Sequence, residues 1–208
     1  MQLISNPRAL AVYAALIGLV ACESTPVAPV GEVAVEVQPS ATTIPNSEAA
    51  TYEWHNGGII SGGASGPLDF GVPSALAPNG ERIFLLGNGT LSLHPKSVTG
   101  GGTFEHFDAS GAPLGSGTWS ATDLLSFHGY GQSQLAFLPP GSTAGRAHFK
   151  VVLDYGGTTV DGMLIVDCAL PDVKFPPSII EGSRLQLRGR MNFNQVFQFT
   201  GGTLFIAL

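Results

Sequence analysis

The chain carries little charge and has no run of basic residues. Charged residues fill 12% of its 208 positions, about half the share that is usual in soluble domains. Nine Lys and Arg residues stand against 15 Asp and Glu residues, which gives a formal net charge of −6. Proteins that bind nucleic acid draw much of their affinity from cations that neutralise phosphates. We therefore predict that this protein has no nucleic-acid partner.

Cysteine is scarce as well, since the chain has only Cys22 and Cys168. Two cysteines exclude a disulfide framework, and their spacing is not that of a zinc motif. The five histidines are His55, His94, His106, His128 and His148. No two of them stand at the His-x-His or His-x₃-His spacing of a local metal site. We predict no metal and no cofactor, although histidines converging from adjacent strands would instead make a metal-storage protein.

Helical periodicity is missing too. The chain has 28 Gly and 15 Pro residues, and we find no convincing apolar stripe of period 3.6 that is free of them. This excludes a helical bundle or coiled coil, while a hydrophobic share of 44% excludes an intrinsically disordered chain. From Thr51 to Leu208 the period is two, which is typical of β-strands.

A short apolar segment stands near the N-terminus. After Arg8, residues 9–20 are apolar, and as a helix they would rise only about 18 Å, against roughly 30 Å for a bilayer core. This length suits the hydrophobic region of a secretory signal. We therefore expect a signal helix that is removed during export. An ordinary signal peptide and an uncleaved anchor both stay open as alternatives to the one described next.

The segment ends in Leu19-Val20-Ala21-Cys22, which resembles the lipobox of bacterial lipoproteins. That resemblance implies a signal peptide at 1–21, acylation of Cys22 with fatty acyl chains such as palmitate, and a membrane anchored through them. It implies a location in the bacterial cell envelope, facing the periplasm or the exterior. Several acyl chains, at roughly 0.8 kcal/mol per buried methylene, would make such an anchor stable.

The segment 22–50 is rich in Pro, Val, Ala, Ser and Thr and holds no aromatic residue. Such a composition favours an extended, semi-rigid tether between the lipid and the domain. The strict alternation of residues 32–37 has a second interpretation, a strand that joins the main sheet.

Residues 51–208 are predicted to form a single all-β domain. Hairpin signals are Asn88-Gly89 between two apolar runs, a loop at 109–116, and Gly156-Gly157 between residues 146–155 and 158–168. Eight to eleven short strands joined in this way favour an antiparallel β-barrel, with a β-sandwich as the alternative. Closing a barrel would remove exposed strand edges, which are prone to aggregation. The calycin and dirigent barrels are similar in strand style, an analogy of fold alone.

Several runs from residue 87 onward resemble an uncharacterised family of secreted bacterial all-β domains. They are residues 98–111, 115–122, 161–168, 181–187 and 203–206. The resemblance implies secretion and an all-β fold, and it brings no activity with it.

The candidate catalytic residues are His106 and Asp108. Strand alternation would place both side chains on one face, with Glu105 on the other, so that the carboxylate could orient the histidine as a base. The alternative is an exposed histidine with no role. Cys168 follows an apolar run and stands beside Asp167, so we expect a buried structural thiol rather than a nucleophile.

Two functions compete on this basis. The first is a non-enzymatic, lipid-anchored domain that binds a small apolar ligand or an envelope component. The second is an isomerase or hydrolase that acts on a small hydrophobic ligand at the mouth of a barrel, with His106 as its base. The two differ in whether His106 and Asp108 converge on an open cavity.

Overall fold

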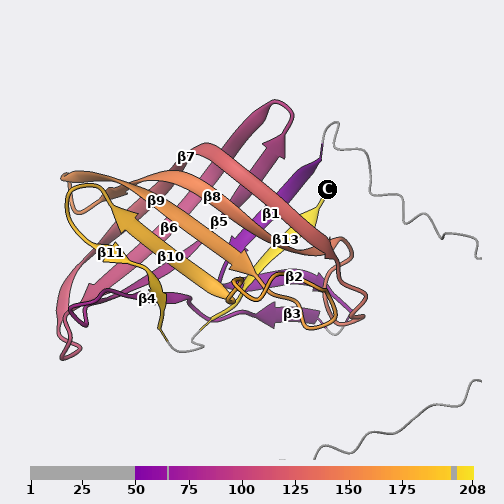
Figure 1. Cartoon of the computed structure of the whole chain (residues 1–208), viewed down its shortest axis with the longest axis horizontal. Coiled ribbons are helices and arrows are strands. Elements are labelled where there is room, and N and C mark those ends of the chain that lie inside the picture. Colours follow the sequence, from indigo (N-terminus) through magenta and orange to yellow (C-terminus); the bar gives the residue numbers. More distant parts are fainter. Residues whose placement is uncertain (1–49, 65, 198–200) are drawn as a thin grey trace, which may run out of the picture. The chain divides into compact units, whose positions relative to one another are not determined.

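A computed structural model of the chain describes residues 50–64, 66–197 and 201–208, and all of the regular elements in these ranges are β-strands (Figure 1). The prediction of an all-β domain is thus confirmed. The strands are β1 (Thr51–Asn56), β2 (Ile59–Gly63), β3 (Gly66–Asp69), β4 (Ser74–Leu76), β5 (Arg82–Leu93), β6 (Lys96–Phe107), β7 (Pro113–Gln132), β8 (Ser142–Asp154), β9 (Thr159–Cys168), β10 (Gly182–Leu187), β11 (Asn192–Phe193), β12 (Gln195–Val196) and β13 (Thr203–Ala207).

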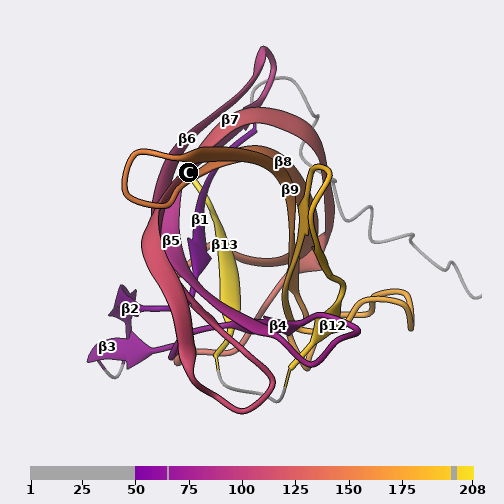
Figure 2. The ribbon, with the colours of Figure 1, turned by 90° about the vertical axis from the view of Figure 1, so that its left-hand side faces the viewer.

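Eleven of the strands form one antiparallel sheet, and β2 and β3 form a separate hairpin. Within the sheet, β8 pairs with β13, β13 with β1, β1 with β5, β5 with β6, β6 with β7, and β7 with β8. The pairing therefore returns to the strand where it started, and we call these six strands (β1, β5, β6, β7, β8 and β13) the circuit. Figure 2 shows the circuit end-on, with β7 and β8 arching over β1 and β13.

Two of these strands change partner along their length. The edge of β5 pairs with β1 over 87–92 and with β4 over 82–84. The edge of β8 pairs with β13 at 142–143 and with β9 over 145–154. Since β9 and β13 both run antiparallel to β8, β13 begins where β9 ends. We call this place the changeover, and it positions the site described below.

Aromatic rings fill the space inside the circuit. Trp54 packs against Trp119 at 5.7 Å and against Phe149 at 5.2 Å between ring centroids, and Phe205 packs against Phe127 at 5.0 Å. Trp54, Phe149 and Phe205 are fully buried. Burial of such rings stabilises a fold strongly, since each removes 150–250 Å² from water. Most aromatic residues in the described ranges belong to this core or pack against it.

Both indole groups also hold the sheet together. The Nε1–H of Trp54 donates to the carbonyl oxygen of Thr99 at 3.2 Å, and that of Trp119 to the carbonyl of Leu86 at 3.1 Å. A buried indole N–H needs such a partner. Gly87 provides the space, because a Cβ there would stand 2.5 Å from the ring of Trp119.

The predicted hairpin at Asn88-Gly89 is wrong. Both residues lie in the middle of β5, which continues to Leu93, and the chain turns at His94-Pro95 instead. Gly89 serves a close approach of strands, since a Cβ there would stand 2.0 Å from the carbonyl oxygen of Thr99. The physical need for glycine was thus real, but it arises from a neighbouring strand and not from a turn.

The other two predicted hairpins are present. β6 and β7 pair around the turn at 108–112, and β8 and β9 pair around Gly156-Gly157. Gly156 and Gly157 have φ angles of 66° and 100°, a region that glycine enters without steric cost. Cys22 and the predicted segments 1–21, 22–50 and 32–37 lie outside the described residues, apart from Ala50.

Candidate functional site

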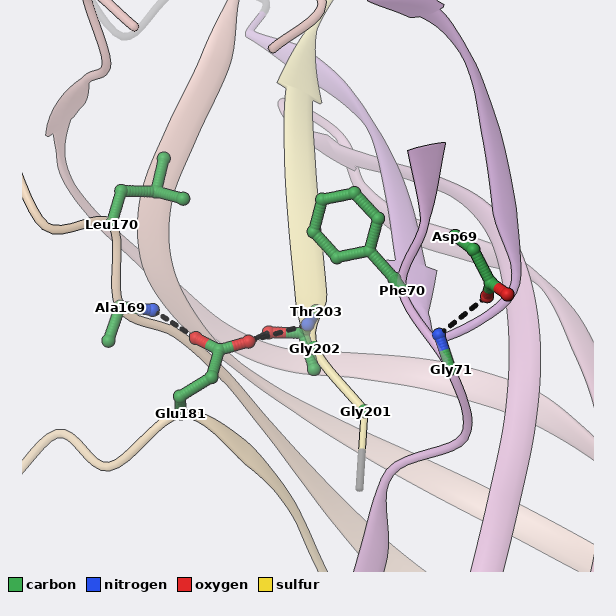
Figure 3. A pocket seen from close by; sticks show the side chains of 9 residues that line it. All are labelled: Asp69, Phe70, Gly71, Ala169, Leu170, Glu181, Gly201, Gly202 and Thr203. Atoms are coloured by element: carbon green, nitrogen blue, oxygen red, sulfur yellow. Dashed lines mark hydrogen bonds between the residues drawn. The ribbon is translucent and has the colours of Figure 1, made fainter. Parts of the chain in front are cut away.

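The changeover leaves backbone donors without a strand partner, and a carboxylate accepts from them. Ala169 is the first residue after β9, and Thr203 is the first residue of β13. Glu181 stands between them (Figure 3): Oε2 accepts from the N–H of Ala169 and Oε1 from the N–H of Thr203, the latter at 2.5 Å. Buried backbone N–H groups are costly when unpaired. Glu181 therefore joins the end of one strand to the beginning of the next.

A hydroxyl group adds to this network. Oγ1 of Thr203 donates to the carbonyl oxygen of Asp167 at 2.6 Å and also lies 3.0 Å from Oε1 of Glu181. A hydroxyl has one hydrogen to donate. When that hydrogen goes to Asp167, the contact with Glu181 is best satisfied by a protonated carboxyl group that donates to Oγ1.

The electrostatics of Glu181 agree with this. Burial raises its pKa from 4.5 to about 7, against the opposing effect of the N–H groups of Ala169 and Thr203 and the Thr203 hydroxyl. The three donors favour the ionised form, but the loss of hydration outweighs them. The carboxyl group therefore changes charge near neutral pH.

Glu181 forms part of the wall of a surface pocket of about 430 Å³. This is within the range of small-molecule sites. The pocket is lined by Asp69, Phe70, Gly71, Ala169, Leu170, Glu181, Gly201, Gly202 and Thr203. In Figure 3 the ring of Phe70 stands between Asp69 and Glu181, and Leu170 and Phe70 both lie above the Glu181 carboxylate, to its left and right. The wall thus combines two acids with two apolar side chains.

Another acid, Asp167, lies one residue before the end of β9. Asp167 is fully buried and pairs with two arginines. Arg146 donates to it through Nε at 2.5 Å and through Nη2 at 2.8 Å, and Arg184 donates through Nη2. Arg146 also donates to the carbonyl of Ser178 at 3.2 Å. The cluster fastens β8, β9, β10 and the segment before β10 to one another.

Arg146 and Arg184 stand on the faces of β8 and β10 opposite the core residues Ala147 and Leu185. These faces are not fully open to water, since the side chains of Arg146 and Arg184 are only 25% and 17% exposed. His148, on the same face as Arg146, has its pKa lowered, first by burial and then by the two arginines.

His106 and Asp108 belong to different arrangements. Nε2 of His106 lies 2.8 Å from Oε2 of Glu81, and its ring meets Phe193 edge-on. His106 pairs with Ile83, a core residue, so its side chain faces inward. The histidine therefore has a carboxylate partner, and that partner is Glu81.

Asp108 organises the turn between β6 and β7. Its Oδ1 accepts from the N–H of Ser110, the hydroxyl of Ser110 and the N–H of Ala112. The Ser110 hydroxyl is the main cause of a lowered pKa at Asp108. A second surface cavity of about 400 Å³ lies near this turn, and Glu105, Phe107 and residues 113–116 line it. Neither it nor the pocket at Glu181 is lined by His106 or Asp108.

Cys168 is buried, as predicted. Burial raises the pKa of its thiol well above the usual value, and the nearby Glu181 raises it further. A thiol of this kind is a poor nucleophile. The sequence pointed to Asp167 as the acid that acts on this thiol, whereas the structure assigns that effect to Glu181.

Comparisons with other proteins place no constraint on the site. No family model matches the chain, and searches of curated proteins and of solved structures found no match. In the described ranges, His, Cys, Asp and Glu side chains form no group of three that could hold a metal ion. A helix long and apolar enough to span a membrane is likewise missing from these ranges.

Sequence reasoning missed the pocket at Glu181 entirely. Glu181 occurs in the run 181–187 that carries part of the family resemblance, but no local motif marks it as a site residue. Its partners Ala169 and Thr203 are 12 and 22 positions away. Only the order of strands along β8 brings them together.

Proposed function

We propose that this protein is a bacterial envelope lipoprotein, anchored through acylated Cys22, whose β domain binds a ligand without chemical conversion. The circuit of six paired strands is, in this proposal, a closed β-barrel that belongs to the secreted family described above. Its aromatic interior is filled, so the ligand site lies outside the circuit. The observation that carries the proposal is the pocket of about 430 Å³ at the changeover.

The chemistry of that pocket suits binding better than catalysis. Phe70 and Leu170 offer apolar contact, and Asp69 and Glu181 offer acceptors for hydrogen bonds. The nearest thiol, Cys168, is buried and protonated. A small apolar ligand with a polar group, or an envelope component with such a part, fits this combination.

The binding proposal is tested with the whole protein and a variant that fills the pocket. A Cβ at Gly202 would stand 2.9 Å from the Phe70 ring and 3.4 Å from Oε1 of Glu181, so Gly202→Ala narrows the space without changing charge. Extracted envelope lipids and cell-wall glycans are incubated with each protein, and retained material is identified by mass spectrometry. The proposal predicts retention by the wild type and at least about fivefold less by Gly202→Ala. Retention of nothing, or equal retention by both, contradicts it.

The anchor is tested by counting thiols. The chain has two cysteines, and acylation through a thioether would leave only Cys168 free. We expect one reactive thiol per chain in membrane-extracted protein unfolded in denaturant. Two thiols, or a mass that still includes residues 1–21, would contradict the anchor. Cys22→Ala should release the protein from the membrane fraction.

A second candidate function rests on the pair of His106 and Glu81, whose nitrogen and oxygen lie 2.8 Å apart. A partly buried histidine with a carboxylate partner can act as a general base. In this alternative the protein is an isomerase or hydrolase for a small hydrophobic ligand. Hydrolysis of p-nitrophenyl esters that disappears in His106→Phe would favour it, and hydrolysis no faster than in buffer would count against it.

A further inference from the structure

The backbone N–H groups of the pocket wall are largely used by the protein itself. Phe70 donates to the carbonyl of Gly58 at 2.8 Å, and Gly71 donates to Oδ1 of Asp69 at 2.8 Å. Gly202 donates to the carbonyl of Phe70 at 2.7 Å, and the N–H groups of Ala169 and Thr203 both donate to Glu181. The hydroxyl of Thr203 donates to the carbonyl of Asp167. A ligand that needs donors, such as an anion, would find these already occupied.

Acceptors, in contrast, are in surplus. A carboxylate offers about four acceptor positions, and when Glu181 is ionised the N–H groups of Ala169 and Thr203 fill two of them. Asp69 receives the N–H of Gly71 on Oδ1, which leaves acceptor capacity on Oδ2. Among the residues that line the pocket there are two acids and no Lys, Arg or His. The wall therefore favours a group that is both a donor and positively charged.

The apolar part of the wall limits the size and shape of the ligand. Phe70 and Leu170 both lie above the Glu181 carboxylate in Figure 3. An aromatic face near a carboxylate also attracts a cation, because the ring presents negative charge at its face. A volume of about 430 Å³ holds a compact molecule and not a long chain.

We infer that the pocket at the changeover binds a compact apolar molecule that carries a primary ammonium group, with Glu181 as its acceptor and Asp69 as a second negative charge in the wall. This inference rests on the proposed function, and it adds the charge and class of the ligand. The ammonium donates to a remaining lone pair of Glu181, Asp69 adds a second negative charge to the wall, and the apolar body lies against Phe70 and Leu170.

The test compares three probes of nearly the same shape and different charge. Cyclohexylmethylammonium, cyclohexylmethanol and cyclohexanecarboxylate are titrated into the full-length protein by calorimetry at about pH 8, above the pKa of about 7 at Glu181. We expect the ammonium to bind at least about tenfold more tightly than the alcohol, and no binding of the carboxylate. Equal binding of the three would overturn the ammonium assignment and leave the pocket as a ligand site. No binding of any of them would overturn the assignment and count against the pocket as well.

Variants locate the effect. Glu181→Gln and Asp69→Asn each remove one negative charge, and each should weaken ammonium binding at least about fivefold. Asp161→Asn removes the charge of an exposed acid on β9 that does not line the pocket, and it should bind like the wild type. Since Glu181→Gln also loses an acceptor for Thr203, Asp69→Asn keeps the inference testable if that variant does not fold. Unchanged affinity in Asp69→Asn, or an equal loss in Asp161→Asn, overturns the inference.

Discussion

Two acids, Asp167 and Glu181, stand within one network and are stabilised in different ways. Asp167 is fully buried and meets two guanidinium groups, those of Arg146 and Arg184. Glu181 accepts only from neutral donors, and its pKa rises to about 7. The hydroxyl of Thr203 touches both, through the carbonyl of Asp167 and through Oε1 of Glu181. Neutral donors therefore leave an acid able to change charge near neutrality.

The difference follows from the groups that surround each acid. Glu181 satisfies strand ends at the changeover, where the donors are backbone N–H groups without charge. Asp167 lies on the outward side of β9, between arginines of the two adjacent strands β8 and β10. Arg146 is itself held by the carbonyl of Ser178, to which it donates at 3.2 Å. Protonation of Glu181 leaves no unpaired charge beside it, whereas protonation of Asp167 would leave two guanidinium groups without an anion.

The largest effect is expected from Asp167→Asn. This change leaves two guanidinium groups partly buried with no anion between them, and we expect the free energy of unfolding to fall by about 3–5 kcal/mol. Urea unfolding followed by tryptophan fluorescence measures it, since Trp54 and Trp119 are both buried.

The matched control for this prediction is Asp161→Asn. Asp161 lies on the same strand and is exposed, so its loss of charge should cost less than about 0.5 kcal/mol. A replacement of the whole cluster, Arg146→Met with Asp167→Leu and Arg184→Met, should restore most of the lost stability, because it removes all three buried charges together. Equal, small losses in both single variants would show that the ion cluster contributes little.

The second prediction concerns pH and Glu181. The pKa of Glu181 is raised in the folded state to about 7, so the folded protein binds a proton that the unfolded chain has released. The resulting stabilisation is fully present below about pH 4.5 and is lost as the pH rises through about 7. It amounts to at most roughly 3 kcal/mol.

Glu181→Gln cannot titrate at this position and should lack this dependence. The unfolding free energy of the wild type minus that of Glu181→Gln should therefore fall as the pH rises from about 4.5 to about 7. Urea unfolding at a series of pH values measures it. A difference that is constant over this range would mean that Glu181 keeps its ordinary pKa.

Much of the fold could be predicted from local pattern. The hairpin signal at Gly156-Gly157, between residues 146–155 and 158–168, identified β8 and β9. The Asn88-Gly89 signal failed because a glycine required by a neighbouring strand looks like a glycine required by a turn. Local sequence does not distinguish the two cases.

The candidate site could be predicted much less well. The changeover depends on which strand follows which along β8, and no segment of the sequence encodes that by itself. His106 was identified as a residue with a carboxylate partner, but the sequence suggested its neighbour Asp108 and the fold provides Glu81, 25 positions away. Asp108 is instead occupied by Ser110 and Ala112.

A third prediction addresses the hydroxyl that the two acids share. Thr203→Val keeps the shape of the side chain and removes its oxygen, which leaves the carbonyl of Asp167 without this donor. We expect the free energy of unfolding to fall by about 1–2 kcal/mol. Thr203→Ser retains the hydroxyl and should recover part of that loss. If serine were no better than valine, the contribution of Thr203 would lie in its methyl group.

The smallest effect is expected at a third acid, Glu81, whose partner is one histidine. The side chains of Glu81 and His106 are 21% and 15% exposed, respectively, so water still reaches the pair. Asn79 also donates to Glu81, at 2.7 Å. Glu81→Gln keeps a hydrogen-bonding group beside His106, and we expect a loss below about 1 kcal/mol in urea unfolding. A loss as large as that of Asp167→Asn would mean that partial exposure to water does not weaken an ion pair in this protein.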